Sequence, residues 1–195
     1  AYEICEQLGW KAPDWILVGV GDGCIIGGLG KGLRDLASLG WIDKLPKLMG
    51  VQAEGSAALY NAWKEGTEEV KPVEPHTIAD SISVGMPRDR IKALRAVRYT
   101  GGAFITVSDE EILEAMRLLG REAGIFAEPA GAAPFAGLLK ARKEGLIGPE
   151  ERVVVLVTGN GLKDVGSAMK AAGNPIIVEP DIKAVREAIS SLKGG

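Results

Sequence analysis

An apolar run that ends in closely spaced glycines constrains this chain more than any other feature. The stretch VGVGDGCIIGGLGKGL begins at Val18, inside the apolar segment WILVGV of residues 15–20. A short continuous apolar run of this kind is typical of a buried parallel strand. A helical pattern follows over residues 25–39. The sequence therefore predicts a strand, a glycine-rich turn and a helix in direct succession.

The rest of the chain alternates predicted strands with predicted helices. Further strands are expected over residues 47–53, 104–107, 153–157 and 176–178, and further helices over residues 1–8, 56–64, 88–99, 130–144 and 181–192. Ser108 and Glu111 form a capping box at the start of one more helix. Strands separated by helices pair in parallel through right-handed crossovers. We therefore predict a single α/β domain over residues 1–195, with an open, mostly parallel twisted sheet and helices on both faces.

Composition excludes several classes of protein. The net charge of −3 disfavours a nucleic-acid-binding surface, which is normally basic. No apolar segment approaches the roughly 18 residues that a membrane span needs. The two cysteines, Cys5 and Cys24, are too few for a disulfide framework or a cysteine-based metal cluster and predict a cytoplasmic protein. The first predicted helix has no N-cap residue, so we expect the chain to be part of a longer protein. A processed or trimmed terminus is the alternative.

The glycine-rich turn has the chemistry of a phosphate site. Gly21 and Gly23 carry no β-carbon in the path of a ligand and allow a positive φ, so successive main-chain N–H groups can point at one anion. The helix that begins near Cys24 and Ile25 adds its unpaired N–H groups and its dipole. The stretch lacks the Gly-Lys-Ser/Thr of a Walker loop and the third glycine of a dinucleotide fingerprint. A tight turn that binds no ligand is the alternative.

Three segments together resemble one enzyme family. VGVGDGCIIGGLGKGLRDL, GIFAEPAGAAPFAGL and VVVLVTGNGLKD occur in the order and spacing of the carboxy-terminal half of threonine synthase, a fold-type II pyridoxal-phosphate enzyme. HTIADSISVGMPRD is similar to a segment from the middle of the same family. The resemblance covers nearly the whole chain. It implies pyridoxal 5′-phosphate as cofactor, a fold like that of the tryptophan synthase β subunit, and a homodimer.

The resemblance also implies site residues. The family's glycine-rich turn holds the cofactor phosphate through main-chain N–H groups, and it corresponds here to Gly21, Asp22, Gly23, Cys24 and Ile25. A Ser or Thr at a late strand end contacts the pyridine nitrogen in the family, and Thr158 is the matching residue. The alternative is that Thr158 is an ordinary β-branched residue at a strand end, with its hydroxyl hydrogen-bonded to nearby groups. No segment resembles the family's Schiff-base lysine segment, and Lys163 in GLKD belongs to a different motif, so we expect the isolated chain to be inactive.

The implied reaction converts O-phospho-L-homoserine and water to L-threonine and phosphate. Two alternatives stay open: another fold-type II enzyme, such as a threonine or serine dehydratase or a diaminopropionate lyase, and a non-catalytic module that binds phosphate or a nucleotide.

Two candidate residues have ordinary structural explanations. Glu128 fits a helix-start acid as well as a pocket carboxylate, and Asp22 fits a turn residue.

Four further polar residues are candidates for the site. His76, the single histidine, lies in a proline-flanked segment and fits polar surface as well as a substrate contact. Asp80, Ser81 and Ser83 are predicted to line the cofactor cleft by resemblance only.

Overall fold

A four-stranded parallel sheet organises the computed structural model, which describes residues 1–192. The strand order is β3-β2-β1-β4. The strands are β1 (Trp15–Gly19), β2 (Lys47–Ala53), β3 (Ala103–Val107) and β4 (Val153–Val155). Every adjacent pair of these strands is parallel. The α/β class and the parallel sheet are therefore confirmed.

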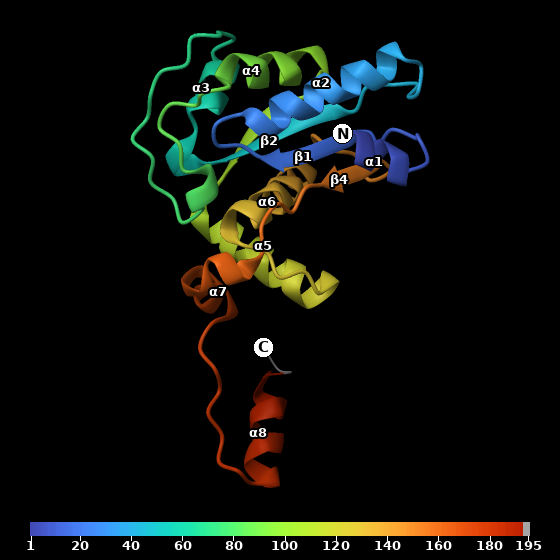
Figure 1. Ribbon diagram of the computed structural model, residues 1–195. Coiled ribbons are helices and arrows are strands. Elements are labelled where there is room, and N and C mark those ends of the chain that lie inside the picture. The colour runs from blue at the N-terminus through green and yellow to red at the C-terminus, as the bar shows by residue number, and fades with distance from the viewer. Residues whose placement is uncertain (193–195) are drawn as a thin grey trace.

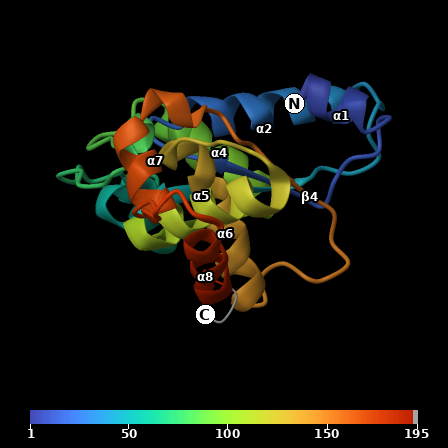
Figure 2. The ribbon, with the colours of Figure 1, turned by 90° about the horizontal axis from the view of Figure 1, so that it is seen from below.

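Helices cover both faces of this sheet, as Figure 1 shows. The helices are α1 (Tyr2–Gln7), α2 (Cys24–Ser38), α3 (Ala58–Lys64), α4 (Arg90–Tyr99), α5 (Asp109–Ala123), α6 (Pro129–Lys143), α7 (Val165–Ala172) and α8 (Ile182–Leu192). In Figure 1, α2 and α4 lie above the sheet, and α5 and α6 lie below it. Figure 2 shows α5 and α6 from below, with α2 and α4 behind them. Among the described residues, no helix is both long and apolar enough to cross a membrane.

The central strand β1 feeds a hydrophobic core on each face. Trp15 and Leu17 pack into the core beneath the sheet, and Ile16 and Val18 pack into the core above it. Alternate residues of a strand point to opposite faces, so a strand covered on both sides must be apolar throughout. This arrangement explains the uninterrupted apolar run at residues 15–20.

Two predicted strands differ from the structure. Residues 176–178 form no strand, and the side chain of Ile177 is 93% exposed. An extended segment becomes a strand only where a neighbour accepts its main-chain hydrogen bonds, and within the described chain this segment has no such neighbour. The run at residues 153–157 forms the short strand β4, which lies at an edge of the sheet and pairs with β1 alone.

The capping box and the other helices agree with the predictions. Ser108 accepts from the N–H of Glu111, and the Glu111 carboxylate accepts from the N–H of Ser108 at 2.8 Å. Among residues 1–192, α7 is the one α-helix that the sequence did not predict.

The irregular segment at residues 71–87 is held against the carboxyl ends of the strands. The Ser56 hydroxyl donates to the Val84 carbonyl at 3.1 Å and accepts from the Val84 N–H at 2.9 Å. At the start of α5, the Asp109 carboxylate accepts from the Thr77 hydroxyl at 2.6 Å and from the Ile78 N–H at 3.1 Å. These bonds position a proline-rich stretch that would otherwise lack regular structure.

Candidate active site

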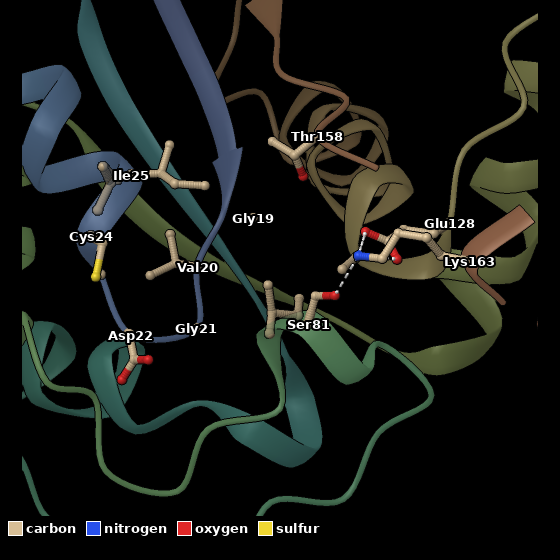
Figure 3. A pocket seen from close by; sticks show the side chains of 14 residues that line it. Gly19, Val20, Gly21, Asp22, Cys24, Ile25, Ser81, Glu128, Thr158 and Lys163 are labelled. Atoms are coloured by element: carbon tan, nitrogen blue, oxygen red, sulfur yellow. Dashed lines mark hydrogen bonds and ion pairs between the residues drawn. The ribbon is translucent and has the colours of Figure 1, made fainter. Parts of the chain in front are cut away.

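The turn after β1 and the turn after β4 meet at one edge of the sheet. Trp15 pairs with Val153 and Leu17 with Val155, so parallel pairing brings the carboxyl ends of the two strands together. Ligands of open α/β sheets bind in the crevice at this edge. A cavity of about 300 Å³ lies there, and its lining includes all of residues 21–25 together with Thr158. Figure 3 shows Gly21, Asp22, Cys24, Ile25 and Thr158 around this cavity.

The main chain of the first turn presents unpaired donors to this cavity. The N–H groups of residues 21–26 have no hydrogen-bond partner within the described chain, although the neighbouring Val20 N–H donates to the Val51 carbonyl at 2.8 Å. These residues form the turn and the first helical turn of α2, where N–H groups lack intrahelical acceptors. Unpaired amides at a helix N-terminus form an anion-binding site. Lys31 and Arg34 do not line the cavity.

The glycines of the turn are required for a reason that the sequence does not reveal. A β-carbon on Gly21 would lie 3.0 Å from Ile82 Cα, and one on Gly23 would lie 2.8 Å from the Ala93 β-carbon. These β-carbons would therefore meet neighbouring segments of the protein, a steric requirement that the sequence did not predict. Gly23 does have a positive φ, of 91°, whereas Gly21 does not. Both glycines allow the 80–84 segment and α4 to approach the turn.

Asp22 connects the turn to the start of α4. Its carboxylate accepts from the Arg88 N–H at 3.0 Å, and its carbonyl accepts from the Asp89 N–H at 2.9 Å. The interpretation of Asp22 as a turn residue therefore has direct support. The carboxylate is engaged by the protein, whereas the main-chain N–H of Asp22 has no partner within the described chain.

The Thr158 side chain points into the cavity from beyond β4, as Figure 3 shows. Its hydroxyl has no hydrogen-bond partner among residues 1–192, and the residue is exposed. The alternative for Thr158 was a hydroxyl that forms a hydrogen bond within its own strand end. The structure contains no such bond among residues 1–192. Thr158 presents a free donor and acceptor to a ligand.

The same cavity contains a charged pair, Lys163 and Glu128, that the sequence did not predict. Lys163 Nζ lies 3.1 Å from Glu128 Oε2 and 3.4 Å from Ser81 Oγ. All three residues line the cavity, and Lys163 is its one cationic side chain among the described residues. The sequence alone assigns Lys163 only to a motif other than the Schiff-base lysine segment. The one available signal was the position of GLKD, directly after a strand end.

Glu128 is the N-cap residue of α6, but its side chain caps no helical N–H group. The side chain is 8% exposed and turns to Lys163 instead. Both interpretations of Glu128 are therefore partly correct, because it starts a helix and also lines the pocket.

Other candidate residues lie outside this cavity. His76 is exposed, and its main-chain N–H donates to the Gly55 carbonyl at 2.9 Å. Asp80 and Ser83 do not line the cavity, whereas Ser81 between them does. The predicted lining role therefore has geometric support for Ser81 alone.

The exposed thiol of Cys24 stands at the rim of the cavity. A hydrogen bond to the Asp89 carboxylate, together with partial desolvation, raises the pKa of this thiol above its ordinary value. The thiol is therefore mostly protonated at neutral pH and is a poor nucleophile.

The family assignment follows from residues 1–159, which match the family model described as "Pyridoxal-phosphate dependent enzyme". The chain belongs to this family. Members depend on pyridoxal phosphate, and the free amides and free hydroxyl of the cavity suit a phosphate and a ring nitrogen. The family supports pyridoxal phosphate rather than a nucleotide as the ligand.

Curated relatives cover almost all of the chain. It is 42% identical over 193 residues to a threonine synthase of Methanocaldococcus jannaschii, and the matched region is 98% of this chain and 48% of the relative. It is 44% identical over 189 residues to a threonine synthase of Methanosarcina acetivorans, and the matched region is 96% of this chain and 47% of the relative. The chain therefore spans about half the length of the curated relatives it matches.

Solved structures share the fold at lower identity. A processed threonine deaminase from Solanum lycopersicum superimposes with a TM-score of 0.69 at 22% identity, over 89% of this chain and 48% of that one. Maize serine racemase gives a TM-score of 0.65 at 22% identity, over 88% of this chain and 49% of the racemase chain. Similarity at this identity establishes the fold and carries no argument about the substrate.

Proposed function

We propose that this chain is the carboxy-terminal, phosphate-binding part of a threonine synthase, which converts O-phospho-L-homoserine and water to L-threonine and phosphate. The observation that carries the proposal is the identity of 42% and 44% with two threonine synthases over 193 and 189 residues. Because the chain spans about half of each relative, the activity belongs to a longer polypeptide that includes it. A homodimer of that polypeptide is part of the proposal.

Pyridoxal phosphate supplies the electron sink for carbanions that form on an amino-acid substrate. The main-chain N–H groups of Gly21, Asp22, Gly23, Cys24 and Ile25 bind its phosphate, supported by their lack of other partners. The Thr158 hydroxyl contacts the ring nitrogen. A hydroxyl cannot hold a pyridinium proton as a carboxylate can, so this contact favours the unprotonated ring and restrains competing carbanion reactions.

This chain does not supply the lysine that carries the cofactor. The Lys163 amine is instead paired with the buried Glu128 carboxylate at 3.1 Å. The residues of this chain therefore bind and orient the cofactor, and proton transfer depends on groups elsewhere in the polypeptide. The isolated chain is expected to show no turnover.

The test uses the full-length protein loaded with pyridoxal phosphate. With O-phospho-L-homoserine, L-threonine and phosphate should appear in equal amounts. Parallel reactions contain L-threonine, L-serine or 2,3-diaminopropionate. Rapid 2-oxo acid formation in these, without threonine formation from the phosphorylated substrate, would support a dehydratase or lyase instead. Turnover by the isolated chain would contradict the assignment of the lysine to another segment.

A further inference from the structure

A buried carboxylate lies beside the residue that we assign to the ring nitrogen. The main-chain N–H of Glu128 donates to the Gly159 carbonyl at 3.1 Å. A β-carbon on Gly159 would overlap Glu128 Oε1, so the carboxylate occupies the space that a side chain would fill there. Gly159 follows Thr158 directly in the chain. The carboxylate therefore contacts the residue next to Thr158, and Glu128 and Thr158 line the same cavity (Figure 3).

An unpaired carboxylate at this place would conflict with the proposed chemistry. A buried anion stabilises a nearby cation and raises the proton affinity of a neighbouring base. Beside Thr158, it would favour the protonated pyridine ring, which a threonine contact is suited to avoid. A second group must therefore compensate the charge of Glu128.

Lys163 is that group. Its Nζ lies 3.2 Å from Oε1 and 3.1 Å from Oε2, so it contacts both carboxylate oxygens. The Lys163 side chain is 60% exposed, whereas that of Glu128 is 8% exposed, so the lysine reaches inward from the solvent. The other titratable side chains that line the cavity are Asp22, in the turn after β1, and Cys24, at the start of α2.

We propose that Lys163 is a positioning residue that neutralises and holds Glu128, so that the ring nitrogen stays unprotonated against Thr158. The inference rests on the proposed placement of the cofactor and adds to it a determinant of the ring's protonation state. Lys163 acts here through Glu128 and not by contact with the substrate.

The test compares variants of the full-length protein reconstituted with pyridoxal phosphate labelled at the ring nitrogen. Lys163→Met and Lys163→Gln remove the charge, Lys163→Arg keeps it, and Lys163→Met with Glu128→Gln removes both charges. Lys140→Met is the matched control, because Lys140 pairs with Glu54 at 3.4 Å and does not line the cavity. The readouts are the chemical shift of the ring nitrogen and the visible absorbance band of the bound cofactor, both followed against pH.

Loss of the lysine charge alone should increase the protonated fraction of the ring nitrogen at neutral pH by about tenfold or more, equivalent to one pKa unit. Lys163→Arg, the double variant and Lys140→Met should match the wild type. An unchanged nitrogen signal and pH profile in either Lys163→Met or Lys163→Gln would overturn the inference, as would a double variant that resembles Lys163→Met. Failure of the wild type to bind pyridoxal phosphate would instead overturn the cofactor placement itself.

Discussion

Gly23 and Ala93 approach so closely that a β-carbon on Gly23 would lie 2.8 Å from the Ala93 β-carbon. This contact joins the glycine-rich turn after β1 to α4, although the two residues are far apart in the sequence. Because Gly23 also has a φ of 91°, the turn depends on glycine for its backbone and for its packing.

Gly23→Ala should therefore destabilise the protein by about 1–2 kcal/mol from the left-handed backbone alone, with more from the contact with Ala93. It should also weaken binding of pyridoxal phosphate, because the turn must shift. Chemical denaturation and cofactor titration measure the two effects. Gly28→Ala is the control, since nothing lies within 4 Å of its added β-carbon and alanine favours the helix. Equal stability of the two variants would contradict the prediction.

Ser56 positions the segment that closes the cavity. Ser56 is fully buried, and its hydroxyl bonds to the main chain of Ile82 and Val84. Ser56→Ala leaves these buried groups unpaired, which should lower the free energy of unfolding by about 1–3 kcal/mol. The exposed Ser38→Ala is the control. Unfolding curves that coincide for the two variants would show that the hydroxyl is dispensable.

Gly159 leaves room for the Glu128 carboxylate. Gly159→Ala should displace that carboxylate and weaken cofactor binding by at least about tenfold, equivalent to 1.4 kcal/mol. Titration with pyridoxal phosphate, followed by absorbance, measures the change. Gly120→Ala in α5 has open space around the added β-carbon and should bind the cofactor normally. Normal binding by Gly159→Ala would mean that the carboxylate has no fixed place in the site.

Cys24 should react slowly with thiol reagents for an exposed cysteine. A raised thiol pKa lowers the thiolate fraction at any pH below it, and the thiolate is the reactive form. The Asp89 carboxylate is the first cause of the raised pKa, so Asp89→Asn should lower the Cys24 pKa and speed alkylation at neutral pH.

Mass spectrometry of peptides that contain Cys24 follows this reaction, and Cys24→Ser defines the background. The buried Cys5 should stay unlabelled in the folded protein. Pyridoxal phosphate should protect Cys24, which lines the cavity. A rate in Asp89→Asn equal to the wild-type rate would contradict the role of the carboxylate.

The helix and strand pattern was readable from local signals. Apolar periodicity and the Ser108 capping box depend on residues within one or two turns of each other, so the main elements and the parallel sheet could be predicted. The family motifs located the turn at residues 21–25 and Thr158 for the same reason. The run at residues 176–178 misled the prediction, because a strand requires a partner that an apolar pattern does not reveal.

The sequence by itself determined the α/β class, the order of the elements and the residues at two strand ends. Only the tertiary structure decided why Gly21 and Gly23 must be glycine, and that Lys163 reaches Glu128. These features depend on contacts between segments that are distant along the chain. Parallel pairing of β1 with β4 brings those segments to one edge of the sheet, and no local pattern encodes the resulting distances.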